Sequence, residues 1–102
     1  MRWYVSGPMT GLPDLNRPAF QQAAATVRAT GHDAINPVEL CPLHIPWKAA
    51  MRMDLAALKT AHGVICLPGW ERSRGARIEV WLARRRGLPV WEFRDWLLVH
   101  AA

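Results

Sequence analysis

Two acidic residues occupy positions where a carboxylate would face a ligand. The first is Glu79, on a helix that is expected to begin at Ser73. Three small residues share its helical stripe: Gly75, Ala76 and Ala83. Small neighbours leave space in front of a carboxylate, which a glutamate facing solvent would not need. The alternative is a surface glutamate paired with Arg77 or Arg84.

The second acidic residue is Asp54, which interrupts an apolar helical stripe. A charge on such a stripe costs several kcal/mol unless it is paired or used. Asp54 is therefore either a ligand-facing acid or a carboxylate paired with Arg52 or Lys59 on the outer flank of its helix. Two carboxylates beside one sugar-sized cleft suit glycosidic chemistry. One attacks the anomeric carbon and forms a covalent ester, while an acid protonates the leaving group and later activates water or another acceptor.

A loop near the amino terminus is a candidate for holding a phosphate or a sugar. It reads Ser6-Gly7-Pro8-Met9-Thr10-Gly11. Its glycines and hydroxyl groups can turn backbone N–H groups toward an anion. It lacks the Gly-Lys-Ser/Thr ending of a Walker loop and the GxGxxG spacing of a dinucleotide-binding loop, so a plain turn is the alternative.

Alternating strands and helices must position these residues. The spacing of apolar residues and breakers predicts strands at 3–6, 32–36, 64–67 and 89–91, and helices at 17–30, 47–61, 73–86 and 94–100. Asn16 and Ser73 are expected to cap helices, and 37–46, with three prolines, is expected to be a loop. This order predicts a small doubly wound α/β domain, a parallel sheet of about four or five strands with helices on both faces, as in Rossmann and flavodoxin folds.

In such a sheet, ligands bind beyond the carboxyl ends of the strands. That rule selects the segments 6–11, 36–47 and 68–75. Asn36, Trp47 and Trp70 lie in them, and either tryptophan could stack on a base, the alternative being a place in the core or in a subunit contact. Three other tryptophans fall at strand or helix positions and are expected in the core: Trp3, Trp81 and Trp91.

The composition is that of one soluble domain over residues 1–102. The net charge of +5 is weak evidence for nucleic-acid binding, because eleven of the thirteen basic residues are arginine and the chain has fifteen alanines, a pattern of biased codon usage. The Arg84–Arg86 run is expected to be a solvated helix end. No apolar stretch approaches the ~20 residues of a membrane span, and no signal peptide is visible, which favours the cytoplasm.

Neither the cysteines nor the histidines suggest a metal or a disulfide. Cys41 and Cys66 lack the spacing of a redox motif and are expected to be free thiols. His32 and His44 have no partner spacing typical of a metal site. We therefore expect no metal and no cofactor.

Several motifs together resemble a known group of proteins. They are Tyr4-Val5-Ser6-Gly7-Pro8-Met9-Thr10-Gly11, Asn16 before Phe20, Asn36-Pro37, Met53-Asp54-Leu55, and Leu67-Pro68-Gly69-Trp70-Glu71-Arg72-Ser73-Arg74-Gly75-Ala76-Arg77-Ile78-Glu79. They resemble a phage and prophage family of small proteins of unassigned function over roughly residues 3–90. That family is in turn similar to the nucleoside 2-deoxyribosyltransferase superfamily, which includes deoxynucleoside 5′-monophosphate N-glycosidases.

The resemblance implies a role for each matching residue. Glu79 would be the nucleophile, Tyr4 would orient it, and Asp54 would contact the leaving base. In the nucleotide-cleaving branch, the 5′-phosphate would be held by three residues: Ser6, Gly7 and Ser73. The resemblance also implies a homodimer or a larger homo-oligomer. Two positions depart from the pattern, since His62 stands where aspartate is common and Glu71 is offset from a second acid of several transferases.

The sequence thus predicts cleavage of an N-glycosidic bond, by hydrolysis or base transfer, in a deoxynucleoside or its 5′-monophosphate. The expected catalytic residues are Glu79, Tyr4 and Asp54. The expected substrate contacts are Ser6, Gly7, Pro8, Met9, Gly11, Asn36, Trp70, Ser73 and Gly75. The alternative is a phage protein that binds or sequesters a nucleotide without catalysis. Nucleic acid is a disfavoured partner, because the tryptophans expected in the core leave few stacking platforms.

Overall fold

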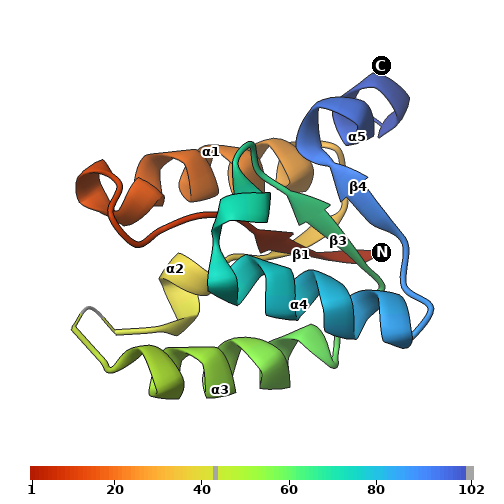
Figure 1. The fold of residues 1–102 in the computed structure, drawn as a ribbon. Coiled ribbons are helices and arrows are strands. Elements are labelled where there is room, and N and C mark those ends of the chain that lie inside the picture. Colours follow the sequence, from red (N-terminus) through yellow and green to blue (C-terminus); the bar gives the residue numbers. More distant parts are fainter. Residues whose placement is uncertain (43, 101–102) are drawn as a thin grey trace.

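A four-stranded, all-parallel sheet forms the centre of the computed structural model, which describes residues 1–42 and 44–100 (Figure 1). The strands are β1 (Arg2–Ser6), β2 (Asp33–Ile35), β3 (Gly63–Cys66) and β4 (Val90–Glu92). Their order in the sheet is β2-β1-β3-β4. The predicted fold class, a small parallel α/β domain, is confirmed.

Helices cover both faces of this sheet (Figure 1). They are α1 (Arg17–Ala29), α2 (Pro37–Leu40), α3 (Trp47–Leu58), α4 (Arg74–Arg85) and α5 (Phe93–His100). On one face, Val27 of α1 and Trp96 of α5 pack against Trp3 and Ile65. On the other face, Leu58, the last residue of α3, packs with Val80 and Ala83 of α4 in a second core cluster.

The alternation of β1 decides which of its side chains reach the site. Successive residues of a strand point to opposite faces of the sheet. Tyr4 packs in the cluster with α3 and α4, whereas Trp3 and Val5 pack in the clusters with α1 and α5. Ser6 lies two residues after Tyr4 and therefore shares its face. Two hydroxyl groups of β1 thus face α4.

The expected loop at 37–46 contains one helical turn, so that prediction is wrong for α2. Asn36 starts the turn, because its Oδ1 accepts a hydrogen bond from the N–H of Val38 at 3.0 Å. Pro37 then occupies the first helical position, where its missing N–H costs nothing. Two short 3₁₀ helices, Pro13–Asn16 and Trp70–Arg72, also precede α1 and α4.

The two expected helix caps differ in the structure. Ser73 caps α4 as predicted, since its Oγ accepts from the N–H of Ala76 at 3.2 Å. Asn16 precedes α1 but has a left-handed backbone (φ 59°) and makes no side-chain cap. Its Nδ2 instead donates to the carbonyl of Pro8 at 2.9 Å. Asn16 therefore ties the loop after β1 to the start of α1.

The prediction of a buried Trp81 is wrong. Trp81 is 59% exposed, because the buried side of α4 consists of Ala76, Glu79, Val80 and Ala83. Trp3 is buried as expected, and Trp91 is half-buried. Cys41 and Cys66 are free thiols, as predicted. Within residues 1–42 and 44–100, no helix has the length and apolar character to cross a membrane.

Candidate functional site

The site lies between β1 and β3, where the order in which the chain adds strands to the sheet reverses. β1 and β3 are central neighbours, and the chain continues from β1 to β2 on one side and from β3 to β4 on the other. The loops that follow β1 and β3 therefore diverge, which opens a crevice at the carboxyl ends of the strands. Gly7 lets the two loops begin close together before they diverge, since a Cβ there would lie 2.8 Å from Cβ of Leu67.

Glu79 is buried at this crevice and is held by both hydroxyl groups of β1. Its side chain is on α4, and the residue is 5% exposed. The hydroxyl of Tyr4 donates to Oε2 at 2.7 Å, and that of Ser6 donates to Oε1 at 2.6 Å. Arg77 and Arg84, its alternative partners, are exposed and form no salt bridge with a described residue. The surface interpretation of Glu79 does not hold.

Asp54 completes a pair of carboxyl groups. It is 7% exposed on α3, and its carboxyl group is near enough to that of Glu79 for each to influence the pKa of the other. The thiol of Cys41 donates to Oδ1 of Asp54 at 3.3 Å. Arg52 and Lys59, the alternative partners, form no salt bridge with a residue that the structure describes. Asp54 therefore faces the inside of the fold.

Burial raises the pKa values of the site. The pKa of Glu79 is raised to about 7, chiefly by burial and also by the nearby Asp54, although the hydrogen bonds from Ser6 and Tyr4 act to lower it. Burial also raises the pKa of Asp54. The pKa of Cys41 rises to about 12, and that of Tyr4 rises well above 10.0, in both cases chiefly through burial. At neutral pH Tyr4 and Cys41 stay protonated donors, and Glu79 is close to its own pKa.

A cavity of about 290 Å³, the inner cavity, lies in front of Glu79. Its wall includes five of the predicted site residues: Gly7, Met9, Ser73, Gly75 and Glu79. The other lining residues are Thr10, Leu15, Phe20, Pro37, His44, Ile45, Trp47, Ala50, Met51 and Ala76. This wall is largely apolar with one buried acid, which is the usual make-up of a small-molecule site.

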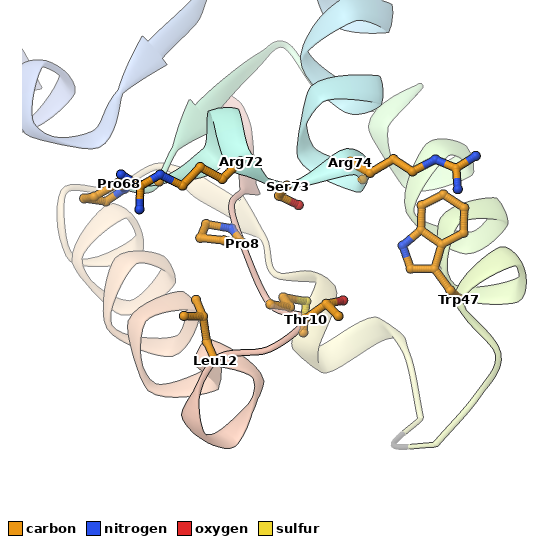
Figure 2. A pocket seen from close by; sticks show the side chains of 11 residues that line it. Pro8, Thr10, Leu12, Trp47, Pro68, Arg72, Ser73 and Arg74 are labelled. Carbon is orange, nitrogen blue, oxygen red and sulfur yellow. The ribbon is translucent and has the colours of Figure 1, made fainter.

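A larger hollow of about 800 Å³, the outer cavity, adjoins it and shares the residues Met9, Thr10, Trp47, Ser73 and Gly75. Pro8, another predicted contact, lines only this outer cavity. Figure 2 shows the side chains of Arg72 and Arg74 extending to opposite sides of Ser73. The guanidinium of Arg74 lies 4.8 Å from the ring centre of Trp47. The outer cavity is therefore basic at its rim.

Three predicted site residues neighbour Glu79 but line neither cavity: Tyr4, Ser6 and Asp54. Ser6 is completely buried, and its hydroxyl hydrogen is donated to Glu79. The phosphate contact that the resemblance implied for Ser6 does not match this position. Its hydroxyl positions the carboxylate instead.

Three other predicted contacts also line neither cavity: Gly11, Asn36 and Trp70. Gly11 makes a turn with φ +82°. Asn36 is buried and caps α2. The indole of Trp70 donates to Glu92 at 3.3 Å, which directs it away from the site. Of the two loop tryptophans, Trp47 is the one that lines the cavities.

The structure adds residues that sequence reasoning missed. Met51 lies one helical turn before Asp54, so its place on the cavity wall follows from a spacing that was visible. Cys41, which follows α2, reaches Asp54 of α3 over a separation of 13 positions in the chain, and no local pattern indicates that contact. His62, the departure noted above, accepts the N–H of Arg2 at 2.9 Å and lies outside both cavities.

Among the described residues, no group of three or more His, Cys, Asp or Glu side chains is placed to hold a metal ion. A family model described as "Domain of unknown function (DUF4406)" matches residues 1–92 of the chain. A comparison with curated proteins found no match.

Proposed function

This chain belongs to the DUF4406 family of domains of unknown function, so its activity must be inferred from its site. We propose that it cleaves the N-glycosidic bond of a 2′-deoxynucleoside or its 5′-monophosphate. The observation that carries the proposal is the buried carboxyl group of Glu79, held by two hydroxyls on the wall of a cavity and paired with Asp54. The resemblance to nucleoside 2-deoxyribosyltransferases supports the substrate class.

The reaction proceeds in two displacements. In the first, a carboxylate oxygen of Glu79 attacks C1′, the bond from C1′ to the base nitrogen breaks, and its electron pair leaves with the base. The base takes a proton from Asp54, whose carboxyl group neighbours that of Glu79 although it does not itself line the cavity, so the products are the free base and a deoxyribosyl ester of Glu79. In the second, water attacks C1′, the ester bond breaks, and the proton of water returns to Asp54.

The carboxyl pair holds the charge and the proton that this sequence requires. A nucleophile must be ionised, whereas a leaving base must be protonated. Burial raises the pKa of both Glu79 and Asp54, so the pair keeps one proton and one negative charge as the pH approaches 7. The active form has the charge on Glu79 and the proton on Asp54.

Tyr4 and Ser6 hold the nucleophile in place. Each donates to a different oxygen of Glu79, which fixes the plane of the carboxyl group and offsets part of the cost of its burial. The raised pKa of Tyr4 keeps its phenol a donor throughout the physiological range. These hydroxyls position the carboxylate and do not take part in bond exchange.

The cavities match the parts of a nucleotide. The sugar and base occupy the inner cavity, where Trp47 and Met51 provide apolar contact for the base. A 5′-phosphate lies at the shared rim, beside Ser73 and the amino end of α4 and between Arg72 and Arg74. Gly75 keeps this passage open, since its added Cβ would lie 3.1 Å from Sδ of Met51.

Base release is the direct test. The protein is incubated with a panel of deoxynucleosides and their 5′-monophosphates, and free base is measured. We expect release by the wild type and at least a 1,000-fold loss in Glu79→Gln, with Glu71→Gln as the control because Glu71 is an exposed acid outside both cavities. A wild type that releases no base, or an active Glu79→Gln variant, contradicts the proposal.

Trapping identifies the nucleophile. A 2-fluoro sugar analogue slows hydrolysis of the ester, so the intact protein gains the mass of the sugar. We expect the modification on the peptide 74–84, at Glu79. Modification of another residue removes Glu79 from this role.

A substrate whose leaving group needs no proton distinguishes an acid role of Asp54 from a structural role. A 2-deoxyriboside of 4-nitrophenol needs no proton, because its leaving group departs as a stable anion. We expect Asp54→Asn to lose base release from nucleosides but to keep most of its activity on this compound. Equal losses on both substrates contradict the acid role.

Binding without turnover is the other outcome of the same experiments. In that case calorimetry shows nucleotide affinity that Glu79→Gln leaves unchanged, and no base is released. We also propose water as the acceptor, a homodimer or larger homo-oligomer, and a cytoplasmic location. Added free base that increases turnover contradicts water as the acceptor, and a monomer in sedimentation contradicts the oligomer.

A further inference from the structure

The outward face of α4 carries a stripe of cations around one tryptophan. At about 100° per residue, five side chains share this face, which we call the α4 stripe: Arg74, Arg77, Trp81, Arg84 and Arg85. All five are exposed. The stripe spans most of a 12-residue helix, about 18 Å in length. It begins at Arg74, on the rim of the outer cavity.

Two arginines pack against tryptophans on this surface. The guanidinium of Arg85 lies 5.2 Å from the ring centre of Trp81, and that of Arg84 lies 5.9 Å from that of Trp70. A hollow of about 480 Å³ is lined by Trp70, Arg77, Val80, Trp81, Arg84 and Arg85. Arg86 does not belong to the surface, because it donates to the carbonyls of Leu58 and Lys59 at the end of α3.

Nothing in the described chain neutralises the stripe. Glu79 is the only acid on α4, and it is buried. No arginine of the stripe forms a salt bridge with a described carboxylate. Five of the eight acidic residues are buried at the site or paired with arginines elsewhere: Asp54, Glu79, Asp14, Asp33 and Glu39. Glu71, Glu92 and Asp95 remain, and Glu92 accepts the indole of Trp70.

This balance points away from a second copy and toward a polyanion. A second copy would bring four more arginines in a symmetric contact and few free carboxylates. A polyanion with flat faces satisfies both kinds of side chain, since phosphates meet the guanidinium groups and bases stack on the indoles. The sequence disfavoured nucleic acid because Trp3, Trp81 and Trp91 were expected in the core, and that premise is wrong for Trp81.

We propose that the α4 stripe binds single-stranded nucleic acid. Bases stack on Trp81 and Trp70, and the phosphates between them contact Arg77, Arg84 and Arg85. Because the stripe leads to Arg74, a bound strand extends toward the outer cavity. The binding does not depend on cleavage of a glycosidic bond.

Filter binding with a 12-nucleotide single strand, as DNA and as RNA, tests the proposal between 50 and 300 mM salt. We expect the logarithm of the binding constant to fall linearly with the logarithm of the salt concentration. The slope should be about −3, the value for contacts with four phosphates of a single strand. Trp81→Ala is expected to bind roughly 10- to 100-fold more weakly through lost stacking. Arg77→Ala/Arg85→Ala is expected to reduce the slope by about 1.4.

Matched controls lie on other helices. Leu98→Ala removes an apolar side chain that is 74% exposed on α5, and Arg52→Ala and Arg94→Ala remove exposed arginines from α3 and α5. We expect these variants to bind like the wild type. All measurements are repeated in a Glu79→Gln background. The binding result can then be interpreted whether or not the protein cleaves glycosidic bonds.

Three results would overturn the proposal. One is the absence of single-strand binding at 50 mM salt. Another is equal affinity of the wild type and Trp81→Ala, together with equal affinity for duplex and heparin, which shows attraction to any polyanion. The third is a wild-type dimer that Trp81→Ala converts to a monomer with unchanged nucleic-acid binding, which assigns the α4 stripe to a second copy.

Discussion

The protonation of Glu79 sets a conflict between folding and the proposed chemistry. Its pKa rises from 4.5 to about 7 in the fold because burial disfavours the carboxylate. Between these values the folded chain binds more protons at this residue than the unfolded chain does. Its contribution to stability is therefore fully present below about pH 4.5 and is lost as the pH rises through about 7. The ionised form that attacks a sugar is also the form that weakens the fold.

Removing this charge should stabilise the protein in alkaline solution. We expect Glu79→Gln to raise the free energy of unfolding by about 2 kcal/mol at pH 8 and by little at pH 5. Urea unfolding at the two pH values measures the difference. A variant that is less stable than the wild type at both pH values contradicts the electrostatic explanation.

Tyr4 should affect both the rate and its pH dependence. Its hydroxyl lowers the pKa of Glu79, so Tyr4→Phe moves that pKa above about 7. We expect the acid limb of base release, along which Glu79 ionises, to shift to higher pH and the rate to fall about 10- to 100-fold, as for loss of a hydrogen bond to a charged group. A loss of equal size at every pH indicates only a structural role.

At the scale of the elements, β3 depends on a glycine that admits no side chain. A Cβ at Gly63 would overlap the indole ring of Trp3 and lie 3.1 Å from Cγ of Pro89. We expect Gly63→Ala to destabilise the protein by about 3 kcal/mol, measured by chemical unfolding. Gly75→Ala is the control, because its Cβ meets the flexible end of Met51 at 3.1 Å. That variant should fold normally and narrow the cavity, which lowers base release.

Local patterns predicted most elements, because strand and helix periods and breakers are short-range signals. The four strands and the longer helices follow from them. The single turn of α2 did not, since four residues after Asn36 are too few to show a period. Trp81 was predicted to be buried because tryptophan is a large apolar residue. Its neighbour Val80 faces the core, so the helical angle directs Trp81 outward.

The site was predictable only in part. The small residues around Glu79 indicated that it faces inward, and its burial agrees with them. The role of Ser6 depends on the alternation of β1 and on the packing of α4 against it, which are contacts 73 positions apart in the chain. The contact of Cys41 with Asp54 joins the end of α2 to α3, 13 positions apart in the chain. Such long-range contacts leave no periodic signal in one sequence.

At the scale of the whole molecule, the sheet divides the core into a functional side and a supporting side. Glu79, Tyr4 and Asp54 belong to the side covered by α3 and α4. Trp96 anchors α5 on the opposite side. Its ring stacks on that of His100 with 4.5 Å between ring centres, and it meets the ring of Trp3 edge-on with 5.9 Å between ring centres. The supporting side holds β1 and β3 from behind, and Phe20 of α1 is its contribution to the wall of the inner cavity.

Loss of this anchor should weaken the entire domain. Trp96 is fully buried, so we expect Trp96→Ala to cost about 3–5 kcal/mol and to lower Tm by more than about 10 °C. Thermal unfolding followed by circular dichroism measures the change. Leu98→Ala on the exposed side of α5 should leave Tm within a few degrees. Similar losses in both variants contradict the anchoring role.

The tryptophans also give this molecule its own optical probes. Trp47 borders both cavities, Trp81 lies on the outward face of α4, and Trp3 and Trp96 are enclosed in the core. A nucleotide in the site should quench the emission of Trp47, whereas a strand on α4 should quench that of Trp81. Single Trp→Phe replacements then report the occupancy of each place separately, in unlabelled protein and in real time.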